Sequence, residues 1–227
     1  MMTAFNVLLF VHILAGTAAL TAAAVAVTSK SLDLAHHWHI YAGRVFFWGM
    51  VVIFITAIPM SLIKANVPLF LIAIFSFYFA FVGWRRASNR RGTPEPIDWI
   101  GSGLMIIVSV AMLLFGAFAL VTGQISAIII LVFGGIGAAT GWSDLRTLRA
   151  GGLKGKARIA NHLSRMLGGT IATITAFVVT NFTFEPIFVL WLAPTIIITP
   201  IIIWWERRLT AGVKPKGMPS ASSIGSP

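Results

Sequence analysis

Histidine, arginine and aspartate residues gather at a few points of an otherwise apolar chain, and their chemistry is the first question the sequence raises. His12 stands alone inside the first apolar stretch. The other candidates lie near the ends of later apolar stretches: His36, His37, His39, Arg44, Asp98, Asp144, His162 and Arg165. Ionisable groups at bilayer depth are unfavourable unless they are paired or used, so each of them is a candidate for function.

His39 and His162 each open an apolar stretch. Two imidazoles that face each other across a helix bundle are the axial ligands that a b-type haem needs. If Asp144 or Asp98 joined the pair, the mixed nitrogen and oxygen ligands would instead suit zinc or a similar divalent ion. No compact metal motif such as H-E-x-x-H is present. The third interpretation is structural, with these side chains bonding to opposing carboxylates and to lipid phosphates.

His12 also has two interpretations. It is either a proton-relay or single-ligand site, or a neutral histidine that hydrogen-bonds to a neighbouring helix. In the second case Asn181 and Thr180 are the expected partners, because both are polar residues within an apolar stretch.

Two arginines lie deeper than the interface. Arg44 and Arg165 are about one turn inside their apolar stretches, where an unpaired charge is unfavourable unless the side chain snorkels to the surface. Asp98 and Asp144 are their expected partners.

The elements that position these side chains are predicted to be membrane-spanning helices. The mean hydropathy is +0.92, and 10% of residues are charged, against about 25% in soluble proteins. A helix needs roughly 20 apolar residues to cross a ~30 Å hydrocarbon core. Such stretches are found at 4–28, 40–63, 66–84, 98–121, 125–143, 160–181 and 186–205. Because the stretches are continuous rather than alternating, the fold class is all-α, a bundle of seven transmembrane helices.

Lysine and arginine predict the orientation of the bundle. They fall in every second connection and in the tail: Lys30, Arg85, Arg86, Arg90, Arg91, Arg146, Arg149, Lys154, Lys156, Arg158, Arg207, Arg208, Lys214 and Lys216. The opposite connections hold only Lys64. Basic connections stay in the cytoplasm, so we expect the N-terminus outside and the C-terminus inside a plasma membrane of bacterial type. Six tryptophans near the same boundary agree: Trp38, Trp84, Trp99, Trp142, Trp204 and Trp205.

The net charge of +11 indicates an anionic partner. The basic residues do not form one stripe on a folded surface but are spread over four membrane-proximal segments. Anionic lipid headgroups on the cytoplasmic side are therefore expected, and nucleic acid is not. The absence of cysteine excludes disulfides, iron–sulfur clusters and covalently attached haem. There is no G-x-S-x-G, no phosphate-binding P-loop and no lysine in the seventh stretch for a retinal Schiff base. No enzymatic activity is indicated.

Residues 1–205 are expected to form one membrane domain, followed by a flexible basic tail at 206–227. Three landmarks suggest an internal duplication: HILAGTAAL resembles VFGGIGAAT, HIYAGR resembles HLSRMLGG, and PLFLIAI resembles PIFVLWL. Their nearly constant offset predicts a 3+1+3 arrangement, in which helices 1–3 and 5–7 are parallel repeats. Chance similarity between apolar helices is the alternative.

The segments HILAG, HIYAGRVFF, IFSFYF and HLSRMLGGTIATITAFVVTN resemble a bacterial family of uncharacterised multi-pass membrane proteins, domain of unknown function 2306 or a close relative. The resemblance covers most of the chain up to the seventh helix, and it implies no established reaction or ligand. It places His12, His39, Arg44, His162 and Arg165 on motif positions, which makes them the first residues to mutate.

Three hypotheses about function follow. The protein is an accessory or assembly protein with paired rim side chains and no cavity. Alternatively, it binds or transports a small solute, which predicts a polar cavity at mid-depth between the two halves. As a third alternative, it is a membrane redox protein that holds b-type haem or a divalent metal between His39 and His162.

Overall fold

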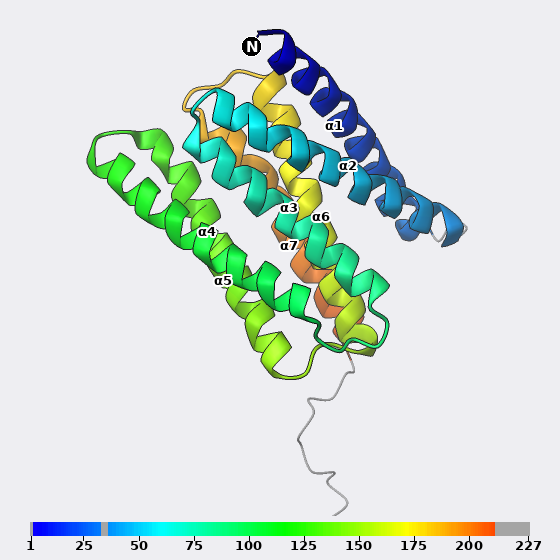
Figure 1. The fold of residues 1–227 in the computed structure, drawn as a ribbon. Coiled ribbons are helices and arrows are strands. Elements are labelled where there is room, and N and C mark those ends of the chain that lie inside the picture. The colour runs from blue at the N-terminus through cyan, green and yellow to red at the C-terminus, as the bar shows by residue number, and fades with distance from the viewer. Residues whose placement is uncertain (1, 33–35, 212–227) are drawn as a thin grey trace, which may run out of the picture.

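The computed structural model describes residues 2–32 and 36–211 and is built of long helices (Figure 1). The helices are α1 Met2–Ser31, α2 His36–Ile63, α3 Val67–Ser88, α4 Pro96–Val121, α5 Ile128–Arg149, α6 Gly155–Asn181 and α7 Phe188–Thr210, with a 3₁₀ turn at Ile125–Ala127 before α5. All seven are long and apolar enough to cross a membrane. The all-α fold class and the seven helices are confirmed, and the fold is that of a multi-pass membrane protein.

Several helices run past the apolar stretches into polar residues at one or both ends. Polar side chains cap the starts of α3 and α4. At the start of α3, the Asn66 side chain accepts a hydrogen bond from the Leu69 backbone N–H at 3.0 Å. At the start of α4, the Asp98 carboxylate accepts one from the Glu95 backbone N–H at 2.9 Å. α7 continues to Thr210, so the first residues of the expected tail are helical. The rest of that tail, 212–227, lies outside the described residues.

Two of the seven helices form a central pair, and the other five lie around it. α3 and α6 pack against each other, the α1–α2 hairpin lies to one side of them, and the α4–α5 hairpin lies to the other (Figure 1). α7 packs mainly along α6. The α3–α4 and α5–α6 connections touch each other, because the backbone at Gly152 lies against the Gly92 carbonyl. We call the end of the bundle with these two connections the basic end, and the other the opposite end.

Small residues set how closely the paired helices approach. A Cβ atom at Gly49 of α2 would lie 3.0 Å from the Ala19 Cβ of α1. In α5, a Cβ at Gly137 would lie 2.7 Å from the Met105 Cε of α4. Small residues thus let the neighbouring helix come close, and van der Waals contact at these positions holds the pairs together.

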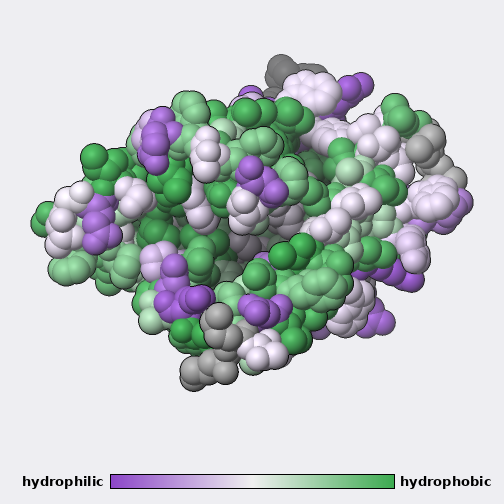
Figure 2. All heavy atoms as spheres, turned by 90° about the horizontal axis from the view of Figure 1, so that it is seen from above, coloured by the Kyte–Doolittle hydropathy of each residue, from purple (hydrophilic) through white to green (hydrophobic). Residues whose placement is uncertain are grey.

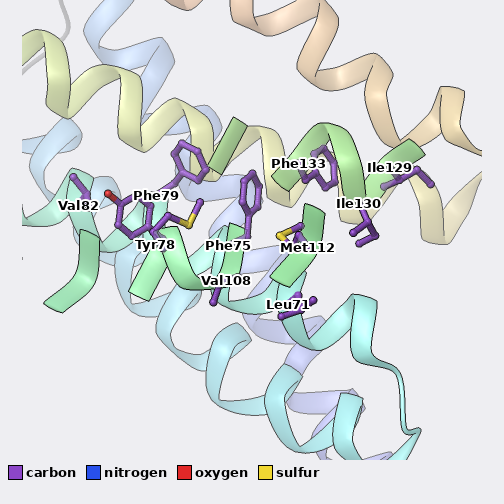
Figure 3. Packing of buried hydrophobic residues seen from close by; sticks show 11 residues of the cluster. Leu71, Phe75, Tyr78, Phe79, Val82, Val108, Met112, Ile129, Ile130 and Phe133 are labelled. Atoms are coloured by element: carbon purple, nitrogen blue, oxygen red, sulfur yellow. The ribbon is translucent and has the colours of Figure 1, made fainter. Parts of the chain in front are cut away.

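The largest apolar core lies between α3, α4 and α5 (Figure 3). The rings of Phe75 and Phe133 stack with their centroids 5.4 Å apart. Met105 and Met112 of α4 are fully buried beside them. This core fixes α5 against α3, which determines where the side chains at the basic end of α5 can reach.

The packing of the helices gives no support to the 3+1+3 repeat. α1 packs along the whole of α2, whereas α5 and α6, which the repeat equates with them, are not among the extensively packed pairs of the described chain. α5 packs along α4 instead. The repeat stays a prediction.

Candidate functional site: a cavity beside a buried charge network

Asp144 is the centre of a buried network of charged and polar side chains near the basic end. Its carboxylate is fully buried on α5. The Tyr78 hydroxyl of α3 donates to Oδ2 at 2.6 Å, and Arg165 Nη2 of α6 donates to Oδ1 at 3.1 Å. Arg86 Nη2 lies 3.7 Å from the same Oδ1. We call these four residues the charge network. Of the two carboxylates expected to partner Arg44 and Arg165, Asp144 thus binds Arg165.

Further contacts tie the charge network to the ends of the helices. Arg86 Nε donates to the Asn161 side-chain oxygen at 3.0 Å, and Arg158 donates to the Arg86 carbonyl oxygen. α3, α5 and α6 are therefore joined by polar contacts at one level. In an apolar surrounding such contacts fix the relative position of helices, because breaking them would leave buried charges without partners.

Asp98 has a different partner from the one expected. Arg85 Nε and Nη2 donate to its two carboxylate oxygens at 2.8 and 3.0 Å, and Arg85 also lies 3.1 Å from Glu95. Arg44 is exposed and forms no ion pair within the described residues. Asp98 was expected to partner Arg44 or Arg165, and this is wrong because α3 ends and α4 begins side by side, which puts Arg85 next to Asp98.

His39 and His162 come together at the basic end. Their ring centroids are 6.4 Å apart and the rings are nearly perpendicular, at 86°. His39 Nδ1 lies 3.0 Å from the Ala26 carbonyl oxygen, and His162 Nδ1 lies 2.7 Å from the Gly83 carbonyl oxygen. A carbonyl only accepts, so both Nδ1 atoms are donors; in a neutral imidazole with this tautomer, Nε2 carries the lone pair that a metal would bind.

The larger metal set does not form around these two histidines. No group of three or more His, Cys, Asp or Glu side chains close enough to hold a metal ion exists in the described part of the chain. Asp144 and Asp98 are instead held by arginines. His36 stacks on His39 at 6.4 Å, while His37 is exposed and its ring lies beside Trp38.

His12 bonds to the helix it packs along. Its Nδ1 lies 2.8 Å from the Thr56 hydroxyl of α2. The expected partners are wrong: the Asn181 amide donates to the Phe177 carbonyl of its own helix at 2.8 Å, and Thr180 also bonds within α6. The close contact of α1 with α2 puts Thr56 opposite His12.

A cavity of about 1380 Å³ lies between α1, α2, α3, α5, α6 and α7. Phe5, Lys64 and Asn181 border it at the opposite end, and Ser164, Arg165 and Glu206 border it towards the basic end. Figure 2 looks onto the opposite end and shows a hollow between the helices. Ile, Thr and Phe are the most frequent lining residues, and the accessible surface of the lining is mainly apolar. The expected cavity is therefore present, but it is apolar rather than polar, and the hypothesis of a bundle without a cavity does not hold.

The positions of small residues explain where the cavity lies. Towards the basic end α3 and α6 touch, because Gly168 has no side chain where it faces the Phe79 ring. A Cβ atom at Gly168 would come within 2.5 Å of that ring. Further along α6 towards the opposite end, Ala172 and Ala176 border the cavity, and Gly16 of α1 borders it from the other side. Nothing lies within 4 Å of a Cβ added at Gly16. Small side chains on both walls leave the space open.

Two residues of the cavity wall each have a buried polar atom without a hydrogen-bond partner among the described residues. The atoms are Arg165 Nε and Thr175 Oγ1. The Arg165 side chain is only 7% exposed. The two residues are ten positions apart on α6, so their levels differ by about 15 Å. Arg165 thus belongs both to the charge network and to the wall of the cavity.

The sequence did not single out Tyr78, Arg86 or Asn161 as parts of the network. Their signal was weak because a tyrosine or asparagine in a span, or an arginine beside a helix end, is common at a membrane interface.

Neither a family model, nor a curated protein, nor a solved structure matches the chain.

Proposed function

We propose that the protein is a multi-pass membrane protein that binds a membrane-soluble small molecule in the cavity between α1, α2, α3, α5, α6 and α7. The observation that carries this proposal is that Arg165 and Thr175, which line the same space, each have a buried polar atom without a partner, Nε and Oγ1. Buried polar groups are almost always bonded to something, and an occupant of the cavity would supply the missing partner.

The size of the cavity supports the same proposal. Sites for small molecules typically enclose about 300–1,000 Å³ and are mainly apolar with a few polar groups. This cavity is larger, at about 1380 Å³, and a long lipid-like molecule suits such a space. An apolar lining disfavours a continuous column of water, since ordered water needs two to four polar partners.

We further propose that the basic end faces the cytoplasm of a bacterial cell and contacts anionic headgroups. The basic connections support this orientation, and so does the interfacial tryptophan chemistry. Arg146 and Arg149 lie over the Trp142 ring at 5.5 and 5.6 Å, and Arg208 lies over Trp204. Membership of the family of domain of unknown function 2306 is likewise proposed, on the motifs quoted above.

Occupancy of the cavity can be tested by blocking it. Hexadecanol and hexadecanoate are titrated into protein held in lipid nanodiscs, and the unfolding temperature is followed, because a ligand of the folded state stabilises it by mass action. We expect a saturable rise for at least one of them. Ala172→Trp, which fills the cavity, should abolish the rise. Ala117→Trp on α4, exposed and outside the cavity lining, should retain it.

The proposal fails if neither amphiphile stabilises the wild-type protein. It fails equally if the rise is the same in Ala172→Trp, because the effect would then come from the bilayer rather than from the cavity.

A second candidate function is metal or b-type haem binding by His39 and His162. The observation in its favour is the orientation of the imidazoles, since ligating histidines usually give their other N–H to a carbonyl or carboxylate. Each Nδ1 has such a carbonyl. Purified protein from haem-replete cells should then show a Soret band or bound metal that His162→Ala removes. A colourless and metal-free wild-type protein would contradict it.

A further inference from the structure

The charge network is not electrically balanced. Its two guanidinium groups, on Arg86 and Arg165, meet a single carboxylate, on Asp144. Tyr78 adds a neutral hydroxyl donor. Both arginine side chains are at least nine-tenths buried, at 9% and 7% exposed. One positive charge is therefore left over in a place where an uncompensated charge is strongly unfavourable.

The surplus charge is carried on the cavity side. Arg86 is the arginine nearer the basic end, and its Nε is satisfied by Asn161. Arg165 bonds Asp144 through Nη2 only, and its Nε has no partner although it is buried. Of the two arginines, Arg165 is the one that borders the cavity.

Neighbouring carboxylates do not supply the missing charge in the described part of the chain. Glu95 and Asp98 are both engaged by Arg85. Glu206 borders the same cavity, but it forms no ion pair with Arg165 within 4.0 Å among the described residues. An anionic occupant of the cavity would supply the counter-charge.

We infer that the ligand is a long-chain amphiphile with a carboxylate head, which binds Arg165 while its chain runs along α6 past Thr175 towards the opposite end. This inference rests on the proposed ligand-binding cavity. A carboxylate is the planar acceptor that matches a guanidinium edge. It carries one negative charge, which equals the surplus of the network.

The size and lining of the cavity indicate the chemistry of the rest of the ligand. The wall between the levels of Arg165 and Thr175 extends for about 15 Å along α6, and it includes Gly168, Ile171 and Ala172. An extended hydrocarbon chain would lie there in mainly apolar surroundings. A short hydrophilic anion would leave this wall bare.

Selectivity for the head group tests the inference on the wild-type protein. Hexadecanoate, hexadecanol and hexadecyl phosphate, which share one chain, are compared in nanodiscs by the shift in unfolding temperature. Hydrogen bonds to charged groups predict that hexadecanoate binds about tenfold tighter than hexadecanol. Hexadecyl phosphate, with about −1.5 to −2 charges at pH 7, should bind more weakly than hexadecanoate.

Each result separates this inference from the proposed function. Equal binding of hexadecanoate and hexadecanol, abolished by Ala172→Trp, would overturn the carboxylate and keep the ligand cavity. Tighter binding of hexadecyl phosphate than of hexadecanoate would also overturn the carboxylate. If none of the three amphiphiles binds, both the carboxylate inference and the proposed ligand cavity are wrong.

Two variants assign the selectivity to one cation. Arg165→Gln should abolish the preference for hexadecanoate over hexadecanol. Lys64→Gln, which removes the cation at the other end of the cavity, should keep it. If Arg165→Gln does not fold, the double variant Asp144→Asn, Arg165→Gln removes one charge of each sign and serves in its place. A preference that survives loss of Arg165, or that is lost with Lys64, would contradict the inference.

Discussion

At the scale of single residues, Asp144 matters most, because three helices depend on its carboxylate. A buried ion pair adds little stability compared with an apolar pair, but removing one partner of it leaves the other charge uncompensated. Here two guanidinium groups would be left without their carboxylate. The charge network therefore acts as a constraint on how α3, α5 and α6 are placed, and it holds Arg165 at the wall of the cavity.

Replacement of Asp144 should show the size of this effect. Asp144→Asn is expected to reduce the free energy of unfolding by about 3–5 kcal/mol, measured by reversible unfolding in mixed micelles. Tyr78→Phe removes one hydroxyl donor and should reduce it by roughly 1–3 kcal/mol.

Glu95→Gln is the matched control for Asp144→Asn. Its side chain is 53% exposed, and surface ion pairs contribute about 0–1 kcal/mol. If Asp144→Asn were no more destabilised than Glu95→Gln, the charge network would not be holding the helices together.

At the scale of helices, the sequence predicts where the helices lie along the chain, but it does not predict which helices pack against each other. Each span was visible as a run of apolar residues, because crossing a bilayer demands that length and composition. Many helix ends lie further out than expected, such as Ser31, Ser88 and Arg149, because a helix can continue into polar residues that a hydropathy pattern does not count.

Which helices pair depends on the matching of small residues between distant segments. Gly168 under Phe79 joins α6 to α3, and no local pattern identifies Phe79 as the partner. For the same reason depth along the helices indicated that Asp144 or Asp98 would partner Arg165, but not which one, and it did not indicate the partner of His12.

The tight packing of α5 on α4 can be tested with a pair of neighbouring glycines. Gly137→Ala places a methyl group against Met105 and Ser109 of α4 and should destabilise the protein by about 1–3 kcal/mol. Gly135→Ala, with nothing within 4 Å of its new Cβ, should be neutral or gain up to about 1 kcal/mol from helix propensity. Equal unfolding free energies for the two variants would argue against the α4–α5 interface.

At the scale of the whole molecule, the arrangement puts the basic connections at one end and leaves a cavity that is bordered by residues of the opposite end. The α3–α4 and α5–α6 connections meet at Gly92 and Gly152, so they share one side of the membrane. The cavity extends from Lys64 and Asn181 at the opposite end to Arg165 and Glu206 towards the basic end.

Orientation in the membrane can be measured cleanly because the chain has no cysteine. Ser126→Cys, exposed in the α4–α5 connection, and Ala150→Cys, exposed after α5, are treated with a membrane-impermeant maleimide on intact cells. We expect labelling of Ser126→Cys in intact cells, and of Ala150→Cys only after permeabilisation. The reverse pattern would invert the proposed orientation.

The most direct test of the account is the identity of what the protein carries. Wild-type protein, Ala172→Trp and Ala117→Trp are purified in mild detergent, and their bound molecules are identified by native and extraction mass spectrometry. The account predicts a carboxylate amphiphile at about one per chain in wild type and Ala117→Trp, and its loss from Ala172→Trp. The same set of bound molecules in all three proteins would contradict it.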